Sequence, residues 1–107
     1  MTKSQCAKTK FADAIEENVK VVKCDISDRQ QVSKAAYLAE SYFGPVDILI
    51  NNANVIQGKK FLQMSEADAS KTLVVNVESQ FWLHKEVLPS MVERNSGHIV
   101  NIGSVFG

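Results

Sequence analysis

Three short stretches rich in hydrophobic residues have the pattern of strands, and the most apolar of them lies near the centre of the chain. Val46–Ile50 is almost entirely apolar and passes directly into Asn51-Asn52-Ala53-Asn54. Such a run predicts a strand that is covered on both faces, as in a parallel sheet. The valine-rich Val19–Cys24 and the segment His98–Gly103 predict two further strands.

Between these runs, apolar residues recur at helical spacing and predict two helices. The first is expected over residues 27–43, where Ser27 and Gln30 have the spacing of a capping box. Gly44 and Pro45 follow it and favour its termination there.

The second helix is expected over residues 65–94. Ser65 and Asp68 mark its start, and a bend is expected at Pro89 because proline removes a helical hydrogen bond. The apolar run Leu73–Val77 leaves little polar surface in its first half, which predicts burial on two sides.

The order strand, helix, strand, helix, strand predicts an α/β fold with a doubly wound parallel sheet. We expect one domain over residues 19–107, preceded by a poorly patterned segment, 1–18, in which a helix is weakly indicated.

Composition narrows the class of protein. Twelve basic residues balance twelve acidic ones in the 107 residues, so the chain has no net positive charge that would attract nucleic acid. No apolar stretch approaches the ~20 residues of a membrane span. The two cysteines predict no disulfide framework, and with the two histidines they lack metal-ligand spacing, so no metal site is expected.

Polar residues follow the predicted strands, where α/β sheets bind ligands. Asp25, Asn51 and Ser104 each stand at such an end, although each residue type is also common in turns. Asn76 is a single amide in an apolar stretch, so a hydrogen-bond partner is expected for it.

These features together resemble a known family. Asp25 after a valine-rich strand, the Asn51-Asn52-Ala53 run, Asn76 in "VNV", and "GHIVNIGS" ending in Ser104 look like the middle of a short-chain dehydrogenase/reductase over residues 19–107. "FWLHKEVLPSM" and "GHIV" resemble its retinol dehydrogenase and 17-beta-hydroxysteroid dehydrogenase branch. The resemblance implies part of a Rossmann-like domain that binds NAD or NADP, and oxidoreduction of a lipid alcohol or ketone such as a retinoid or steroid.

The resemblance also implies roles for individual residues. Asp25 would accept a hydrogen bond from an adenine amino group, and Asn51, Asn52 and Ala53 would shape the crevice for a cofactor ribose. Asn76 would sit at a helix irregularity and hold a water in a proton relay, and Ser104 would bind the substrate oxygen. Simpler alternatives remain open. Asp25 and residues 51–53 could be ordinary turn residues, and Ser104 could lie in a solvated turn. The amide of Asn76 could be satisfied by backbone groups alone.

The sequence departs from the family pattern in three places. Asn54 stands where the family usually has glycine; asparagine is the other residue that best tolerates positive φ. No glycine-rich pyrophosphate loop is present. No Tyr-x-x-x-Lys pair occurs either, since Ser41 and Val46 stand four residues after the two tyrosines.

These departures lead us to expect a truncated chain that is inactive alone. In a sheet of strand order 3-2-1-4-5-6 its strands would be the third, fourth and fifth. One edge of Val46–Ile50 would then lie open. Either Val19–Cys24 moves across to pair with this edge, or the chain is unstable alone.

Two alternatives belong to other classes of protein. The chain could be a non-catalytic module that forms a homo- or hetero-oligomer through helix 65–94, or an unrelated nucleotide-binding α/β domain. We expect a cytoplasmic location, or the cytosolic face of an intracellular membrane in a longer parent.

Overall fold

A computed structural model gives the structure of the chain and describes residues 18–103. The predicted helix in the first 18 residues lies almost wholly outside this range, as does Ser104. The described elements are α2 (Arg29–Phe43), β1 (Ile48–Asn51), η1 (Phe61–Gln63), α3 (Glu66–Leu73), η2 (Val74–Glu78), α4 (Ser79–Glu93) and β2 (His98–Asn101).

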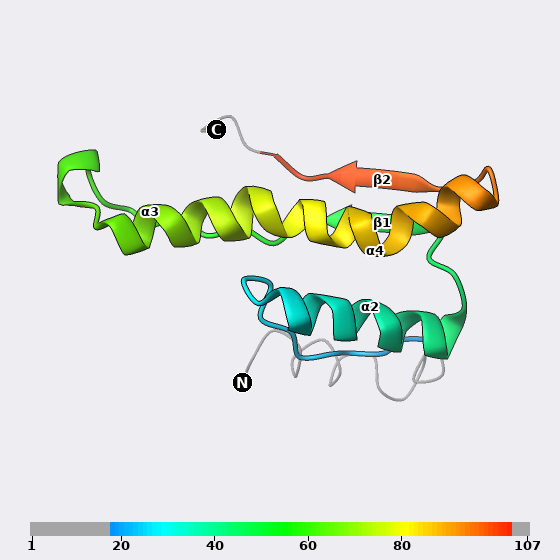
Figure 1. Ribbon diagram of the computed structural model, residues 1–107. Coiled ribbons are helices and arrows are strands. Elements are labelled where there is room, and N and C mark those ends of the chain that lie inside the picture. The colour runs from blue at the N-terminus through cyan, green and yellow to red at the C-terminus, as the bar shows by residue number, and fades with distance from the viewer. Residues whose placement is uncertain (1–17, 104–107) are drawn as a thin grey trace.

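The two strands form a parallel pair joined by the long helical connection α3–η2–α4. Ile48 pairs with His98 and Asn51 with Asn101, so both strands end in an asparagine at the same level of the sheet. In Figure 1, α2 lies beside α4, and α3 extends past the carboxyl ends of the strands. The α/β class and the parallel pairing predicted from the sequence are confirmed, in a sheet of two strands among the described residues.

The prediction of a strand at Val19–Cys24 is wrong. The segment is not helical, but within residues 18–103 it pairs with no other strand, and it runs beside α2, away from β1 and β2 (Figure 1). Valine-rich sequence fits a pleated surface only where a neighbouring strand supplies the hydrogen bonds. The segment therefore neither extends the sheet nor covers the open edge of β1.

The start of α2 also differs from the prediction. Asp28, not Ser27, is the N-cap, and its carboxylate accepts hydrogen bonds from the backbone N–H groups of Gln30 and Gln31. The Ser27 hydroxyl instead donates to Asp25 Oδ1 at 2.6 Å. Serine and aspartate both cap helices. Because the Ser27 hydroxyl is bound to Asp25, Asp28 is left as the cap of α2.

The end of α2 agrees with the prediction. Gly44 has a positive φ of 81°, and its N–H donates to the Glu40 carbonyl. This conformation is open to glycine at little cost, so Gly44 ends the helix.

The predicted helix 65–94 begins as expected, with a capping box formed by Ser65 and Asp68. Its irregularity lies at η2, a π-helical segment, and α4 continues through Pro89. The helix ends at Glu93 with Arg94 as its C-cap, and Asn95 then adopts a positive φ of 52°. The N–H of Ser96 then donates to the Met91 carbonyl, a hydrogen bond that closes the last turn.

The core lies between α2, α4 and one face of the strands. Its buried apolar residues are Val32, Val75, Val87 and Met91. The opposite face of β1 is not covered: Ile48 and Ile50 are 61% and 60% exposed. The expectation of a strand buried on both faces is therefore wrong for this chain, because α4 covers one face only.

Polar contacts near the middle and at the end of α4 attach it to α2 and to the residues before β1. Ser33 of α2 donates a hydrogen bond to the Glu86 carboxylate of α4. At the other end, Arg94 pairs with Asp47 at 2.9 Å and donates to the Val46 carbonyl at 2.8 Å, which ties the end of α4 to the start of β1.

Candidate functional site at the carboxyl ends of the strands

Asn51 ends β1 on the face that α4 covers. Its side chain is buried, and its Nδ2 donates to Asn101 Oδ1 at 2.8 Å and lies 3.0 Å from His84 Nε2. Its carbonyl accepts from the Ile102 N–H at 2.9 Å. Asn51 thus joins β1, β2 and α4 at one end of the sheet.

Sequence reasoning missed His84 and Asn101. The strands "ILIN" and "HIVN" both end in asparagine, and parallel pairing places these residues opposite each other. The asparagine at the end of both strands could therefore have predicted the contact of Asn101 with Asn51. His84 gave no signal, because its partner Asn51 is 33 positions away in the sequence.

The residues after Asn51 lie on the surface. Asn52, Ala53 and Asn54 are exposed, so their backbone is open to a ligand at the carboxyl end of β1. Among the described non-glycine residues only Asn95 has a positive φ. Asn54 therefore adopts an ordinary backbone conformation, and the freedom of a glycine is not required there.

Asn76 lies within η2 and holds the segment that follows β1. Its Oδ1 accepts from the Val55 N–H at 2.8 Å, and its Nδ2 donates to the Val55 carbonyl at 3.0 Å. Its own carbonyl accepts from Gln80 Nε2 at 2.9 Å, which satisfies a group in the irregular turn. Asn76 sits at a helix irregularity, as the resemblance implied, and backbone groups satisfy its amide. Its part in a proton relay stays a prediction.

Asp25 lies in the turn before α2. In Figure 1 the start of α2 points to the same side of the molecule as the carboxyl ends of the strands. Its Oδ1 accepts from the Ser27 hydroxyl at 2.6 Å and from the Ser27 N–H at 3.0 Å. These hydrogen bonds lower the pKa of the Asp25 carboxyl, with a smaller contribution from Lys71 of α3. Its Oδ2 has no hydrogen-bond partner within residues 18–103 and can accept one from a ligand.

The predicted site residues thus fall into two groups. Asn51 and Asn76 support the backbone from inside, whereas Asp25, Asn52 and Ala53 are exposed. A nucleotide cofactor fits this set, since an exposed carboxylate oxygen and an open stretch of backbone are groups that a base and a ribose can contact. Ser104, which the resemblance predicts to bind the substrate oxygen, lies outside the described residues.

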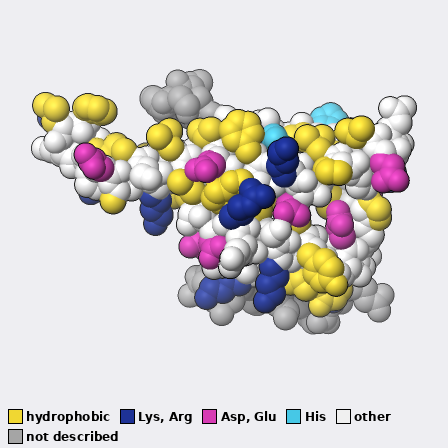
Figure 2. Space-filling model, in the orientation of Figure 1, with side chains coloured by type: hydrophobic (Ala, Val, Ile, Leu, Met, Phe, Trp, Pro, Cys, Tyr) yellow, Lys and Arg dark blue, Asp and Glu magenta, His cyan; other side chains and the backbone are white. Residues whose placement is uncertain are grey.

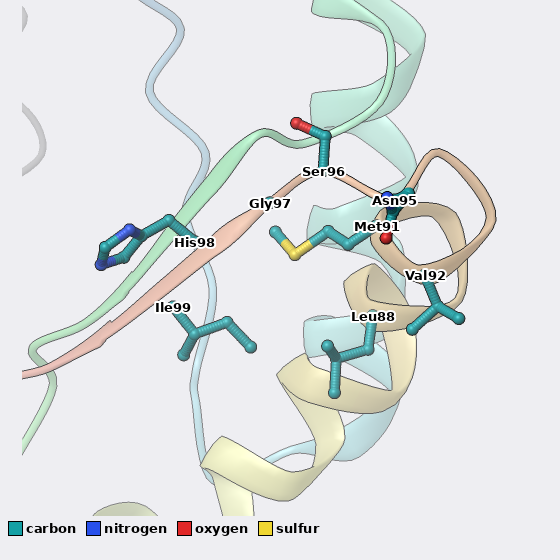
Figure 3. A pocket seen from close by; sticks show the side chains of 8 residues that line it. All are labelled: Leu88, Met91, Val92, Asn95, Ser96, Gly97, His98 and Ile99. Atoms are coloured by element: carbon teal, nitrogen blue, oxygen red, sulfur yellow. The ribbon is translucent and has the colours of Figure 1, made fainter.

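Other possible sites lie elsewhere on the described part of the chain. The cavity of Figure 3 lies between the end of α4 and the start of β2, at the opposite end of the sheet; its walls include Met91, Gly97 and His98. Nowhere in residues 18–103 do three or more potential metal ligands cluster. No described helix has the length and apolar character needed to cross a membrane.

Comparison with known proteins places this geometry in a family. The profile described as short chain dehydrogenase matches residues 2–107. The chain belongs to the short-chain dehydrogenase/reductase family. It is 44% identical over 84 residues to bovine (Bos taurus) short-chain dehydrogenase/reductase family 16C member 6, covering 78% of this chain and 27% of that protein.

Two further relatives belong to the branch that the sequence resembled. Retinol dehydrogenase 10-B of Danio rerio is 40% identical, over 78% of this chain and 25% of that protein. The 17-beta-hydroxysteroid dehydrogenase 13 of Rattus norvegicus is 38% identical, over 83% of this chain and 30% of that protein. The family and its branch are confirmed, and the chain spans less than a third of the length of these relatives.

Solved structures give the same result for the fold. A short-chain dehydrogenase from Streptomyces avermitilis superposes with a TM-score of 0.86 at 27% identity, covering 97% of this chain and 39% of that one. A metagenomic short-chain oxidoreductase in complex with NADP superposes with a TM-score of 0.75 at 29% identity, covering 80% of this chain and 39% of that one. The chain is therefore a partial Rossmann-like unit of an oxidoreductase family that uses NAD(P).

Proposed function

We propose that this chain is the central part of an NAD(P)-dependent oxidoreductase that interconverts an alcohol and a ketone or aldehyde on a lipid-like substrate. Membership of the family supports the reaction class. Relatives that carry the names retinol dehydrogenase and 17-beta-hydroxysteroid dehydrogenase favour a retinoid or steroid. The NADP-bound neighbour supports a nicotinamide cofactor.

The observation that carries the proposal is how Asn76 holds the backbone beyond β1. Two hydrogen bonds to Val55 fix the segment directly after residues 52–54, so an exposed stretch of chain stands at the edge where α/β sheets bind nucleotides. Holding this segment in advance removes part of the entropy cost of binding.

Each residue would have a defined task. Asp25 Oδ2 would accept a hydrogen bond from the adenine amino group, and residues 52 and 53 would lie against a ribose. A bound nicotinamide would supply hydride chemistry, and Ser104 would hydrogen-bond the substrate oxygen. The 107 residues contain no Tyr-x-x-x-Lys pair, so we also propose that they do not complete the reaction alone.

The test is a titration of the chain with NADH and with NADPH by calorimetry. We expect binding, and we expect Asp25→Ala to weaken it severalfold, because a charge-assisted hydrogen bond is lost. Glu93→Gln is the matched control, since Glu93 is an exposed carboxylate at the far end of α4. Equal affinity in Asp25→Ala would refute the role of Asp25, and an absence of binding would refute cofactor binding by this chain.

Turnover is tested separately. Retinol or a hydroxysteroid is added with NAD or NADP, and the absorbance of the reduced nicotinamide is followed. We expect no change with the chain alone. A rate above that of the protein-free mixture would contradict the proposed inactivity while supporting the proposed reaction.

A second candidate function, association through α4, is favoured by the outward face of that helix. Phe81, Leu88 and Val92 recur along one side and are all exposed, with Phe81 at 62%. In Figure 2 hydrophobic side chains gather over α3 and α4. A stripe of this kind is typical of a protein–protein contact.

Co-purification of the chain with a full-length relative, and light scattering of the chain alone, test this association. Phe81→Asp should abolish pairing, and Trp82→Asp should weaken it. Tyr37→Asp should not, because Tyr37 is an exposed aromatic residue on α2. Pairing that survives Phe81→Asp would exclude this face as the contact.

A further inference from the structure

The amide of Asn51 has an uneven set of contacts. Its Nδ2 lies within hydrogen-bond distance of two groups, Asn101 Oδ1 at 2.8 Å and His84 Nε2 at 3.0 Å. Its Oδ1 is buried and has no partner among the described residues. Asn51 as a residue is only 5% exposed, so water does not reach it freely.

These contacts determine which atoms donate. An amide NH₂ has two hydrogens, and the two neighbours of Nδ2 can take one each if Asn101 Oδ1 and His84 Nε2 both accept. Turning the Asn51 amide over would leave two buried N–H groups without acceptors and would require Asn101 to turn as well. One unpaired acceptor costs less than two unpaired donors, so the observed orientation is favoured.

We propose that His84 is a positioning residue that acts through Asn51. Its Nε2 accepts from Asn51, so in the neutral ring the proton is on Nδ1. This hydrogen bond holds α4 against the ends of β1 and β2. Since Asn51 directly precedes Asn52 and Ala53, His84 fixes where the exposed backbone begins.

Only the effect of His84 on the exposed backbone at Asn52 and Ala53 rests on the proposed function. The tautomer of the His84 ring is a property of the chain itself and holds whether or not a nicotinamide cofactor binds. A failure of cofactor binding would therefore leave the assignment of His84 intact, and the two proposals can fail separately.

The test is long-range ¹H–¹⁵N correlation NMR of the ¹⁵N-labelled chain, at a pH where imidazole is neutral. We expect the signals of a histidine protonated at Nδ1 for His84. We expect the Nε2-protonated form, which predominates in free histidine, for the exposed His98. A His84 ring protonated at Nε2, or one that averages both forms as in an unstructured chain, would overturn the proposal.

Two substitutions separate positioning from simple packing. His84→Gln retains an acceptor, whereas His84→Leu is apolar. The leucine variant should exchange the Asn51 side-chain amide hydrogens about tenfold faster, and the glutamine variant should restore most of the protection. Equal exchange in both variants would show that no acceptor at this position is needed.

A third substitution covers the case in which His84→Leu does not fold. Asn51→Ala removes the donor and leaves the ring in place, so the Nδ1-protonated form of His84 should give way to the form found in free histidine. Persistence of the Nδ1-protonated form in Asn51→Ala would overturn the proposal, because another group would then be fixing the ring. His98→Leu is the control and should leave the His84 signals unchanged.

Discussion

Gly97 is the position where a single added methyl group should disturb the fold most directly. It lies between the end of α4 and the start of β2, against the buried side chain of Met91 (Figure 3). A Cβ at residue 97 would lie 2.5 Å from Met91 Cγ, 2.6 Å from Sδ and 2.8 Å from Cβ. The backbone of α4 fixes the Met91 Cβ, so a change of rotamer cannot relieve the last of these contacts.

The expected cost follows from two opposing effects. Overpacking of this kind destabilises by about 1–3 kcal/mol. Replacing glycine by alanine also restricts the unfolded chain, which offsets roughly 0.4–1 kcal/mol, because the φ of Gly97 is not positive. Gly97→Ala should therefore lower the free energy of unfolding by about 1–2 kcal/mol, and the melting temperature by about 5–15 °C.

Thermal unfolding followed by circular dichroism measures this loss. Gly103→Ala is the matched control, because no atom lies within 4 Å of a Cβ at residue 103. Its melting temperature should stay constant or rise slightly. The double variant Gly97→Ala/Met91→Ala should lose less stability than the sum of the single variants, since the clash is gone. A Gly97→Ala chain as stable as Gly103→Ala would refute the packing argument.

Two further predictions concern the helix starts. Asp28→Ala should lower the free energy of unfolding by about 1 kcal/mol, and Ser27→Ala should lower it less, because only Asp28 caps α2; urea titration of both variants checks the order. Hydrogen bonds from Lys59 and Ser65 lower the pKa of the Asp68 carboxyl in the folded chain. The carboxylate therefore stabilises the fold at pH values above the unfolded-state pKa of about 3.9. This stabilisation is lost as the pH falls through the lower folded-state pKa. Melting temperatures measured between pH 6 and pH 2 should therefore fall less steeply for Asp68→Asn than for the unaltered chain, and equal slopes would contradict the assignment.

Local sequence rules located the helices but not always their first residue. Ser27 and Asp28 are both good caps, and the choice depended on Asp25, whose carboxylate takes the Ser27 hydroxyl. Ser65 and Asp68 were predicted correctly because each is the partner of the other in the capping box. A capping rule based on one residue fails where another side chain competes for that residue, as Asp25 does for Ser27. The rule succeeds where both hydrogen-bonding partners belong to the motif, as Ser65 and Asp68 do.

The strand predictions differed for a different reason. β1 and β2 formed because each is the other's partner, whereas Val19–Cys24 found none among the described residues. Strand propensity measures how well side chains fit a pleated surface, and that surface exists only when a neighbouring strand is present. The same limit applies to His84, whose contact with Asn51 joins residues 33 positions apart.

The uncovered face of β1 bears on how the candidate site is built. The run Val46–Ile50 is apolar on both sides, but α4 covers only the side that holds Leu49 and Asn51, while Ile48 and Ile50 remain exposed. The side-chain hydrogen bonds of Asn51 lie on the covered side. The side-chain contacts of Asn51 at the carboxyl end of β1 therefore come from α4 and β2, and the exposed face of β1 contributes none of them. Substitutions at Ile48 and Ile50 should consequently alter association or solubility, whereas substitutions at His84 should alter the site.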